Sequence, residues 1–167
     1  MKPGQKFRNA LKNNKPLIIP GTINAYSAKL AEIANHNSIY LSGSGVAAAS
    51  YGLPDLGVTT LENVLIDAKR ITSATSLPLL VDIDTGWGDF DAISNTIIEM
   101  GNANVAAVHI EDQIFDKRCG HRPNKQLVSI DEMQDRLKAA LDAKIDDSFF
   151  IMARTDALAS EGLSLIH

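Results

Sequence analysis

Residues 77–84, with the sequence LPLLVDID, decide the fold class of this chain. The run is apolar almost throughout and ends in acidic residues, without the alternation of a half-exposed strand. Continuous apolar runs of this length are typical of strands that are covered on both faces of a parallel sheet. Four other runs share the pattern and are predicted to be strands: LIIPGT from Leu17, SIYLSG from Ser38, VAAVHIED from Val105 and FFIMARTD from Phe149.

The segments between these runs are predicted to be helices. Two of them open with the spacing of a capping box, Thr59 with Glu62 and Ser129 with Glu132. The spacing in the second helix predicts a buried stripe at Met133, Leu137, Ala140 and Leu141. Strands that alternate with helices indicate an α/β protein, either a (β/α) barrel or an open doubly wound sheet.

Polar residues follow the last four predicted strands, at positions 42–45, 82–84, 109–113 and 154–156. A barrel builds its active site from the ends of several strands, whereas an open sheet concentrates its ligand at one switch point. This distribution favours the (β/α)8 TIM barrel. The nucleotide-binding alternative is weak, because SGSG at 42–45 lacks the third glycine of a dinucleotide site and no Walker A sequence is present.

Length and composition are those of one globular domain over residues 1–167. The 167 residues are 45% hydrophobic and 22% charged, which is enough for one core. A net charge of −4 and a pI near 5.5, without a basic stripe, argue against a nucleic-acid surface. Small anions remain possible partners.

The single cysteine and the hydropathy pattern bear on the compartment. One cysteine cannot form an internal disulfide, which fits a reducing environment. The N-terminal residues 1–16 lack the continuous apolar core and the small-residue cleavage site typical of a leader peptide, and no run approaches roughly 18 apolar residues. We therefore expect a cytoplasmic protein that does not contact a membrane.

Three carboxylates are expected to converge at the strand ends. Asp82 and Asp84 are two residues apart, so they share one face, and Glu111 ends the neighbouring strand. Three such groups without paired cations would repel one another, and a hard cation bound by oxygen ligands, Mg²⁺ or else Mn²⁺, would remove that cost. The alternative is that the two aspartates cap a helix or bind backbone amides.

The segment 116–125, DKRCGHRPNK, places Cys119 among basic side chains. Neighbouring cations stabilise a thiolate, so Cys119 is a candidate for proton transfer or nucleophilic attack. A lone cysteine is more often a small buried hydrophobe, but so polar a segment is hard to bury.

Arg154 follows the apolar run FFIM and would be costly to bury without a carboxylate beside it. It is a candidate for binding an anionic substrate. The alternative is a structural ion pair with Asp156 or Asp84.

These motifs together resemble the 2-methylisocitrate lyase family of the isocitrate lyase and phosphoenolpyruvate mutase superfamily. The resemblance covers almost the whole chain. It rests on five segments: residues 40–57; residues 77–88, with the sequence LPLLVDIDTGWG; residues 109–113, HIEDQ; residues 117–125, KRCGHRPNK; and residues 151–163. It implies Mg²⁺-dependent cleavage of 2-methylisocitrate to pyruvate and succinate, in the methylcitrate route of propionate breakdown.

The resemblance also implies roles for individual residues. The metal site would hold Asp82, Asp84 and Glu111, and the catalytic residues would be Cys119, Tyr40 and His121. Cys119 is expected to protonate the succinate fragment. Substrate contacts would come from Ser42, Gly43, Ser44, Asp82, Cys119, Gly120 and Arg154. Ser44 departs from the family pattern, which has glycine there.

The family forms complete barrels, which take roughly 250 residues, and homotetramers that exchange a C-terminal helix. This chain is expected to contain the N-terminal five βα units. Three functions remain open: a working lyase, specific for 2-methylisocitrate or acting on isocitrate; an inactive remnant that still binds Mg²⁺ or carboxylate; and a non-catalytic interaction protein.

Overall fold

The computed structural model describes residues 1–115, 117, 119, 122–160 and 162. Strands and helices alternate as the sequence predicts, and the four strands form one parallel sheet in the order β1-β2-β3-β4. The strands are β1 (Ile39–Leu41), β2 (Leu79–Asp82), β3 (Ala107–Glu111) and β4 (Phe150–Arg154). The helices are α1 (Pro3–Asn13), α2 (Ala25–Ile33), α3 (Gly43–Tyr51), α4 (Leu61–Ala74), α5 (Phe90–Asn102), α6 (Ile130–Asp142) and α7 (Ala157–Ser160).

The prediction of a strand from Leu17 is wrong. That segment meets β1 only at an isolated parallel bridge between Gly21 and Tyr40. Pro16 and Pro20 lack the backbone N–H that a sheet ladder needs, so the segment cannot extend the pairing along its length.

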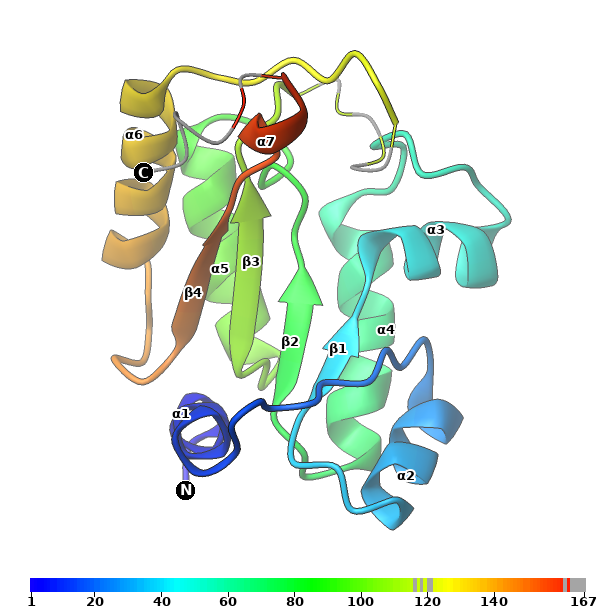
Figure 1. Cartoon of the computed structure of the whole chain (residues 1–167). Helices are drawn as coiled ribbons and strands as arrows, with labels where there is room; N and C mark the ends of the chain where they lie inside the picture. Colours follow the sequence, from blue (N-terminus) through cyan, green and yellow to red (C-terminus); the bar gives the residue numbers. More distant parts are fainter. Residues whose placement is uncertain (116, 118, 120–121, 161, 163–167) are drawn as a thin grey trace.

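The main core lies between the sheet and a layer of helices on its outer face. In Figure 1, α4 and α5 lie behind the strands and α6 lies to the left of β4. β2 and β3 are buried along their full length, as expected for strands covered on both faces. β4 is only partly buried, and no strand in the described ranges pairs with its far side.

A second, smaller core fills the inner face of the sheet. Phe7 of α1 is fully buried there against Leu80 and Ala107, with Phe150 and Met152 partly buried around them. Figure 1 shows α1 at the foot of the sheet, near the beginnings of the strands. The open parallel sheet, with helices along its outer face, is part of a TIM barrel. The strand ends that carry the polar residues face away from α1.

Local sequence explains the helix starts, with one correction. Ser129 caps α6 and accepts a hydrogen bond from the Glu132 N–H, which is one half of the predicted capping box. The Glu132 carboxylate instead accepts from Arg136. The cap of α4 is Thr60, paired with Asn63, and not the predicted Thr59 with Glu62. Thr59 is buried one residue earlier.

The stripe predicted on α6 is correct in part. Ala140 is fully buried, and Met133 and Leu137 pack against the core. Leu141, however, is 51% exposed. The second buried residue of this helix, beside Ala140, is Arg136. Among the described helices, none has the length and apolar character needed to cross a membrane.

Candidate active site

The polar residues at the strand ends are brought together by the register of the parallel sheet. Asp82 of β2 is the register partner of His109 in β3, and Glu111 of β3 is the partner of Arg154 in β4. Parallel strands end at one edge, so side chains that are far apart in sequence become neighbours there. All three predicted acids are almost fully buried at this edge.

Asp82 is held by hydrogen bonds from two neighbouring elements. Its Oδ2 accepts from the Gly43 N–H at 3.2 Å and from the Tyr40 hydroxyl at 3.4 Å. Its Oδ1 accepts from the Asp84 N–H at 3.1 Å. The alternative that these aspartates bind backbone amides is therefore correct for Asp82, which leaves a second role for the same carboxylate open.

Gly43 allows the two aspartates to approach each other. A Cβ at this position would lie 3.2 Å from Asp84 Oδ1 and 3.3 Å from Asp82 Oδ2. Glycine at the start of α3 thus leaves the space into which both carboxylates point.

Lys117 bridges two carboxylates that are distant in sequence. Its Nζ lies 2.6 Å from Asp84 Oδ1 and 2.8 Å from Asp55 Oδ1, and only 6% of its side chain is exposed. Burial acts to lower the pKa of Lys117, but Asp84 and Asp55 outweigh it and raise that pKa. Burial and the charge of Asp82 raise the pKa of Asp84 to about 6, against the opposing effect of Lys117.

Glu111 is paired with Arg154. Its Oε2 lies 3.2 Å from Arg154 Nη1, and its Oε1 accepts a hydrogen bond from Gln113 Nε2 at 3.0 Å. Burial raises the pKa of the Glu111 carboxyl to about 7, although Arg154 acts to lower it. The premise that the three acids lack paired cations is thus wrong, because Lys117 and Arg154 offset two of them.

The cation proposed from the sequence can be tested against these donors. In the described part of the chain, no three His, Cys, Asp or Glu side chains are arranged as a ready set of metal ligands. The oxygens of Asp82 and Asp84 nevertheless converge on the space beside Gly43. Carboxylate oxygens are the donors that Mg²⁺ prefers, so the residues present fit a hard cation.

Cys119 lies next to this cluster. The thiol is partly exposed and makes a hydrogen bond with the Asp55 carboxylate that Lys117 also contacts. Burial acts to raise the pKa of Asp55, but the hydrogen bonds from Lys117 and Cys119 lower it. The predicted residues Gly120 and His121 lie outside the described residues.

Tyr40 is partly buried and lies against the buried His109. The Tyr40 hydroxyl is 3.0 Å from His109 Nε2, and the two rings are stacked. His109 Nδ1 is 3.6 Å from Asp82 Oδ1, which is longer than a hydrogen bond. Burial lowers the pKa of His109, which favours the neutral ring, and burial together with Asp82 raises the pKa of Tyr40.

Ser42 and Ser44 stand at the start of α3. Ser42 caps the helix through the Gly45 N–H, and its hydroxyl lies 3.0 Å from the Ser44 hydroxyl. Ser44 is exposed. Backbone N–H groups at a helix start attract anions, but here the Gly43 N–H donates to Asp82 and the Gly45 N–H donates to Ser42. The contact of this segment with a substrate carboxylate stays a prediction.

Sequence reasoning assigned no role to several residues of this cluster. Asp55, His109 and Gln113 all contact a predicted site residue. Asp156 was expected only as an alternative ion-pair partner of Arg154, and its Oδ2 does lie 3.4 Å from Arg154 Nη2. A signal existed for His109, which shares a strand face with Glu111. None existed for Asp55, because its partner Lys117 is 62 residues away.

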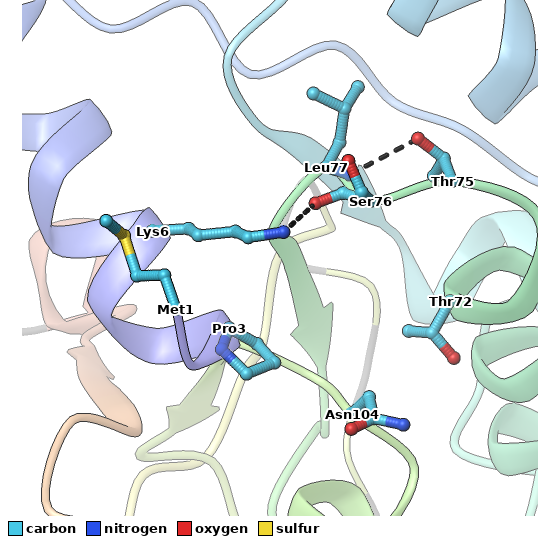
Figure 2. A pocket seen from close by; sticks show the side chains of 8 residues that line it. All are labelled: Met1, Pro3, Lys6, Thr72, Thr75, Ser76, Leu77 and Asn104. Carbon is cyan, nitrogen blue, oxygen red and sulfur yellow. Dashed lines mark hydrogen bonds between the residues drawn. The ribbon is translucent and has the colours of Figure 1, made fainter.

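A cavity of about 250 Å³ lies elsewhere, between α1 and the loops that precede β2 and β3 (Figure 2). Lys6 is the charged side chain in its lining, and it donates to the Ser76 carbonyl. The cavity contains none of the acids described above, so it is separate from the candidate active site.

Comparison with known proteins agrees with this geometry. The sequence model of the family described as phosphoenolpyruvate phosphomutase matches residues 7–165. A curated relative from Shewanella oneidensis, named 2-methylisocitrate lyase, is 64% identical over 160 residues, covering 96% of this chain and 55% of the relative.

Solved structures give the same result. A 2,3-dimethylmalate lyase, described as a PEP mutase/isocitrate lyase superfamily member, matches with a TM-score of 0.90 and 36% identity, over 98% of this chain and 56% of that one. A phosphonopyruvate hydrolase in complex with oxalate and Mg²⁺ matches with a TM-score of 0.80 and 33% identity, over 95% and 54%. This chain spans about half the length of these relatives. With the buried acids at the strand ends and a family match over almost all of its residues, the chain belongs to the phosphoenolpyruvate phosphomutase family.

Proposed function

We propose that this chain carries the metal-binding and proton-transfer part of a carbon–carbon lyase that cleaves 2-methylisocitrate to pyruvate and succinate. The observation that supports this most is the convergence of Asp82, Asp84 and Glu111 with Lys117 and Arg154 at one edge of the sheet. The acids that would hold a metal ion lie there beside basic side chains that would bind the carboxylates of the substrate. The name of the relative from Shewanella oneidensis supports the choice of substrate.

Each residue has a role in the proposal that its contacts support. Asp82, Asp84 and Glu111 would hold Mg²⁺, with Mn²⁺ as a substitute. When bound, the cation supplies a Lewis acid for the hydroxyl oxygen of the substrate, next to the carbon–carbon bond that breaks. Arg154 is 34% exposed at its side chain, so its guanidinium can receive a substrate carboxylate while it remains beside Glu111.

The proton of the substrate hydroxyl would leave to a base of the site as the carbonyl of pyruvate forms, and the proton for the leaving fragment would come from Cys119. Cleavage would leave a carbanion on the succinate fragment, and the Cys119 thiol, which is partly exposed beside the cluster, would protonate it. Ser42, Gly43 and Ser44, together with Gly120 and His121, would contact the substrate carboxylates. Tyr40 would be held in place by His109.

The proposed partners are small-molecule tricarboxylates. A homotetramer in the cytoplasm, which the resemblance implies, stays a prediction. Size-exclusion chromatography with light scattering tests the oligomeric state directly.

A non-catalytic function is the second candidate, because β4 is only partly buried and no described strand covers its far side. In that case the chain would bind a divalent cation and a carboxylate without turning over a substrate.

The experiment measures pyruvate and succinate released from 2-methylisocitrate in the presence of Mg²⁺. It is run with the chain alone and with the remaining part of the Shewanella oneidensis relative added as a separate polypeptide. Isocitrate and 2,3-dimethylmalate are tested in parallel. We expect release from 2-methylisocitrate, its loss in Cys119→Ser, and no loss in Lys138→Met on the exposed side of α6.

Binding of Mg²⁺ and succinate without product under either arrangement would replace the lyase with the second candidate. Faster turnover of isocitrate than of 2-methylisocitrate would keep the lyase and change its substrate.

A further inference from the structure

Asp156 joins three elements around the candidate site. Its Oδ2 accepts a hydrogen bond from Gln113 Nε2 at 2.9 Å and lies 3.4 Å from Arg154 Nη2. Its Oδ1 lies 3.5 Å from Lys125 Nζ. One carboxylate thus links the end of β3, the end of β4 and the residues that follow Cys119.

Further hydrogen bonds fix the backbone of Asp156 and of its partner Gln113. The Asp156 N–H donates to Asp112 Oδ1 at 2.9 Å. Gln113 is 1% exposed, and its backbone carbonyl accepts from the buried Arg136 of α6 at 2.9 Å. Since both the backbone and the side chain of Asp156 are constrained, its carboxylate is a fixed point for the groups that contact it.

Lys125 reaches this fixed point from the Cys119 segment. Only 5% of its side chain is exposed, against 12% for Asp156, so the pair is largely removed from water. On the N-terminal side of the thiol, Lys117 is held by shorter contacts, at 2.6 Å to Asp84 and 2.8 Å to Asp55. In the sequence, Cys119 therefore lies between two lysines, Lys117 and Lys125, whose side chains are both buried in ion pairs.

We propose that the Lys125–Asp156 ion pair is a positioning contact that holds Cys119 against the carboxylate cluster and ties it to Arg154. Asp156 is shared between Lys125 and Arg154, so the group expected to bind a substrate carboxylate and the group expected to deliver a proton are connected through one side chain. The link to catalysis rests on the proposed function. The positioning of the thiol does not.

The only cysteine of the chain makes this contact measurable. A thiol held beside Asp55 reacts slowly with a reagent that must approach its sulfur, whereas a released thiol reacts faster. The rate of reaction with 5,5′-dithiobis(2-nitrobenzoate) therefore reports the position of Cys119. It needs neither a metal nor a substrate.

The test compares four variants with the unchanged chain. We expect Lys125→Met and Asp156→Asn each to raise the labelling rate about tenfold, because a largely buried ion pair is broken. Lys125→Arg keeps the charge and should stay close to the unchanged rate, and Lys138→Met, which removes an exposed lysine of α6, should not change it.

The double variant Lys125→Met with Asp156→Asn decides whether the two residues act as a pair. We expect it to react no faster than the faster single variant, because the same contact is lost once. Thermal melts of all variants exclude global unfolding as the cause of faster labelling.

An unchanged rate in folded Lys125→Met, or independent effects that multiply in the double variant, would overturn the proposal. If Lys125→Met does not fold, the Asp156→Asn and Lys125→Arg rates carry the same decision. A chain that passes this test and releases no pyruvate disproves the lyase alone, and an active chain that fails it disproves only the positioning contact.

Discussion

At the residue scale, the candidate site is a set of buried acids whose charges are offset by neighbours. Asp84 is paired with Lys117, Glu111 with Arg154, and Asp82 accepts two backbone N–H groups. The acids themselves were predictable because they end apolar runs. Their pairing was not, because contacts between residues far apart in sequence depend on how the loops fold back over the sheet.

Gly43 provides a test of this crowding. We expect Gly43→Ala to destabilise the protein by about 1–3 kcal/mol, because its Cβ would press on the Asp82 and Asp84 carboxylates at 3.2–3.3 Å. Gly21→Ala is the matched control, since nothing lies within 4 Å of a Cβ there. Urea unfolding of both variants measures the difference. Equal stabilities would mean that the carboxylates do not converge beside residue 43.

At the element scale, the four strands of the sheet were easier to predict than the first turn of α4. β1 to β4 all lie inside predicted apolar runs, whereas the run from Leu17 failed because prolines interrupt its hydrogen bonding. α4 starts at Leu61 with Thr60 as its cap, one residue later than expected. Two adjacent threonines offer the same capping chemistry, and burial of Thr59 decides between them.

The contact between α1 and the loop before β4 predicts a pH dependence. Asp146 accepts from the Ser148 N–H and hydroxyl, both at 2.9 Å, and pairs with Lys2 at 3.2 Å. The hydrogen bonds from Ser148 lower the pKa of Asp146 below its ordinary 3.8. These contacts therefore stabilise the folded protein in full above pH 3.8, and their stabilisation is lost as the pH falls through the lowered pKa of Asp146.

We expect Asp146→Ala to lower the melting temperature by a few degrees at pH 7, and to differ less from the unchanged chain at pH 3. Asp147→Ala, one residue further along and exposed, should have little effect at either pH. A constant difference between Asp146→Ala and the unchanged chain at both pH values would contradict the assignment.

At the scale of the whole molecule, the described residues form a four-stranded part of a TIM barrel with its outer helices, and the chain spans about half the length of its relatives. The barrel type could be predicted, because polar residues follow several strands and not one. The inner face of the sheet presents Tyr40, Phe150 and Met152 as partly buried side chains, and β4 has an edge that no described strand covers. The site described above gathers at the end of this sheet, and its acids, Arg154 and Cys119 all belong to this chain.

The most direct measurement of the central claim is cleavage of 2-methylisocitrate with Mg²⁺ in D₂O, followed by mass spectrometry of the products. Breaking the carbon–carbon bond leaves a carbanion on the succinate fragment, which must take a proton from an exchangeable group such as the Cys119 thiol. We predict equal amounts of pyruvate and succinate, a single deuterium in each succinate, and loss of both products in Cys119→Ser. Product formation that continues undiminished in Cys119→Ser, or succinate without deuterium, would contradict the account.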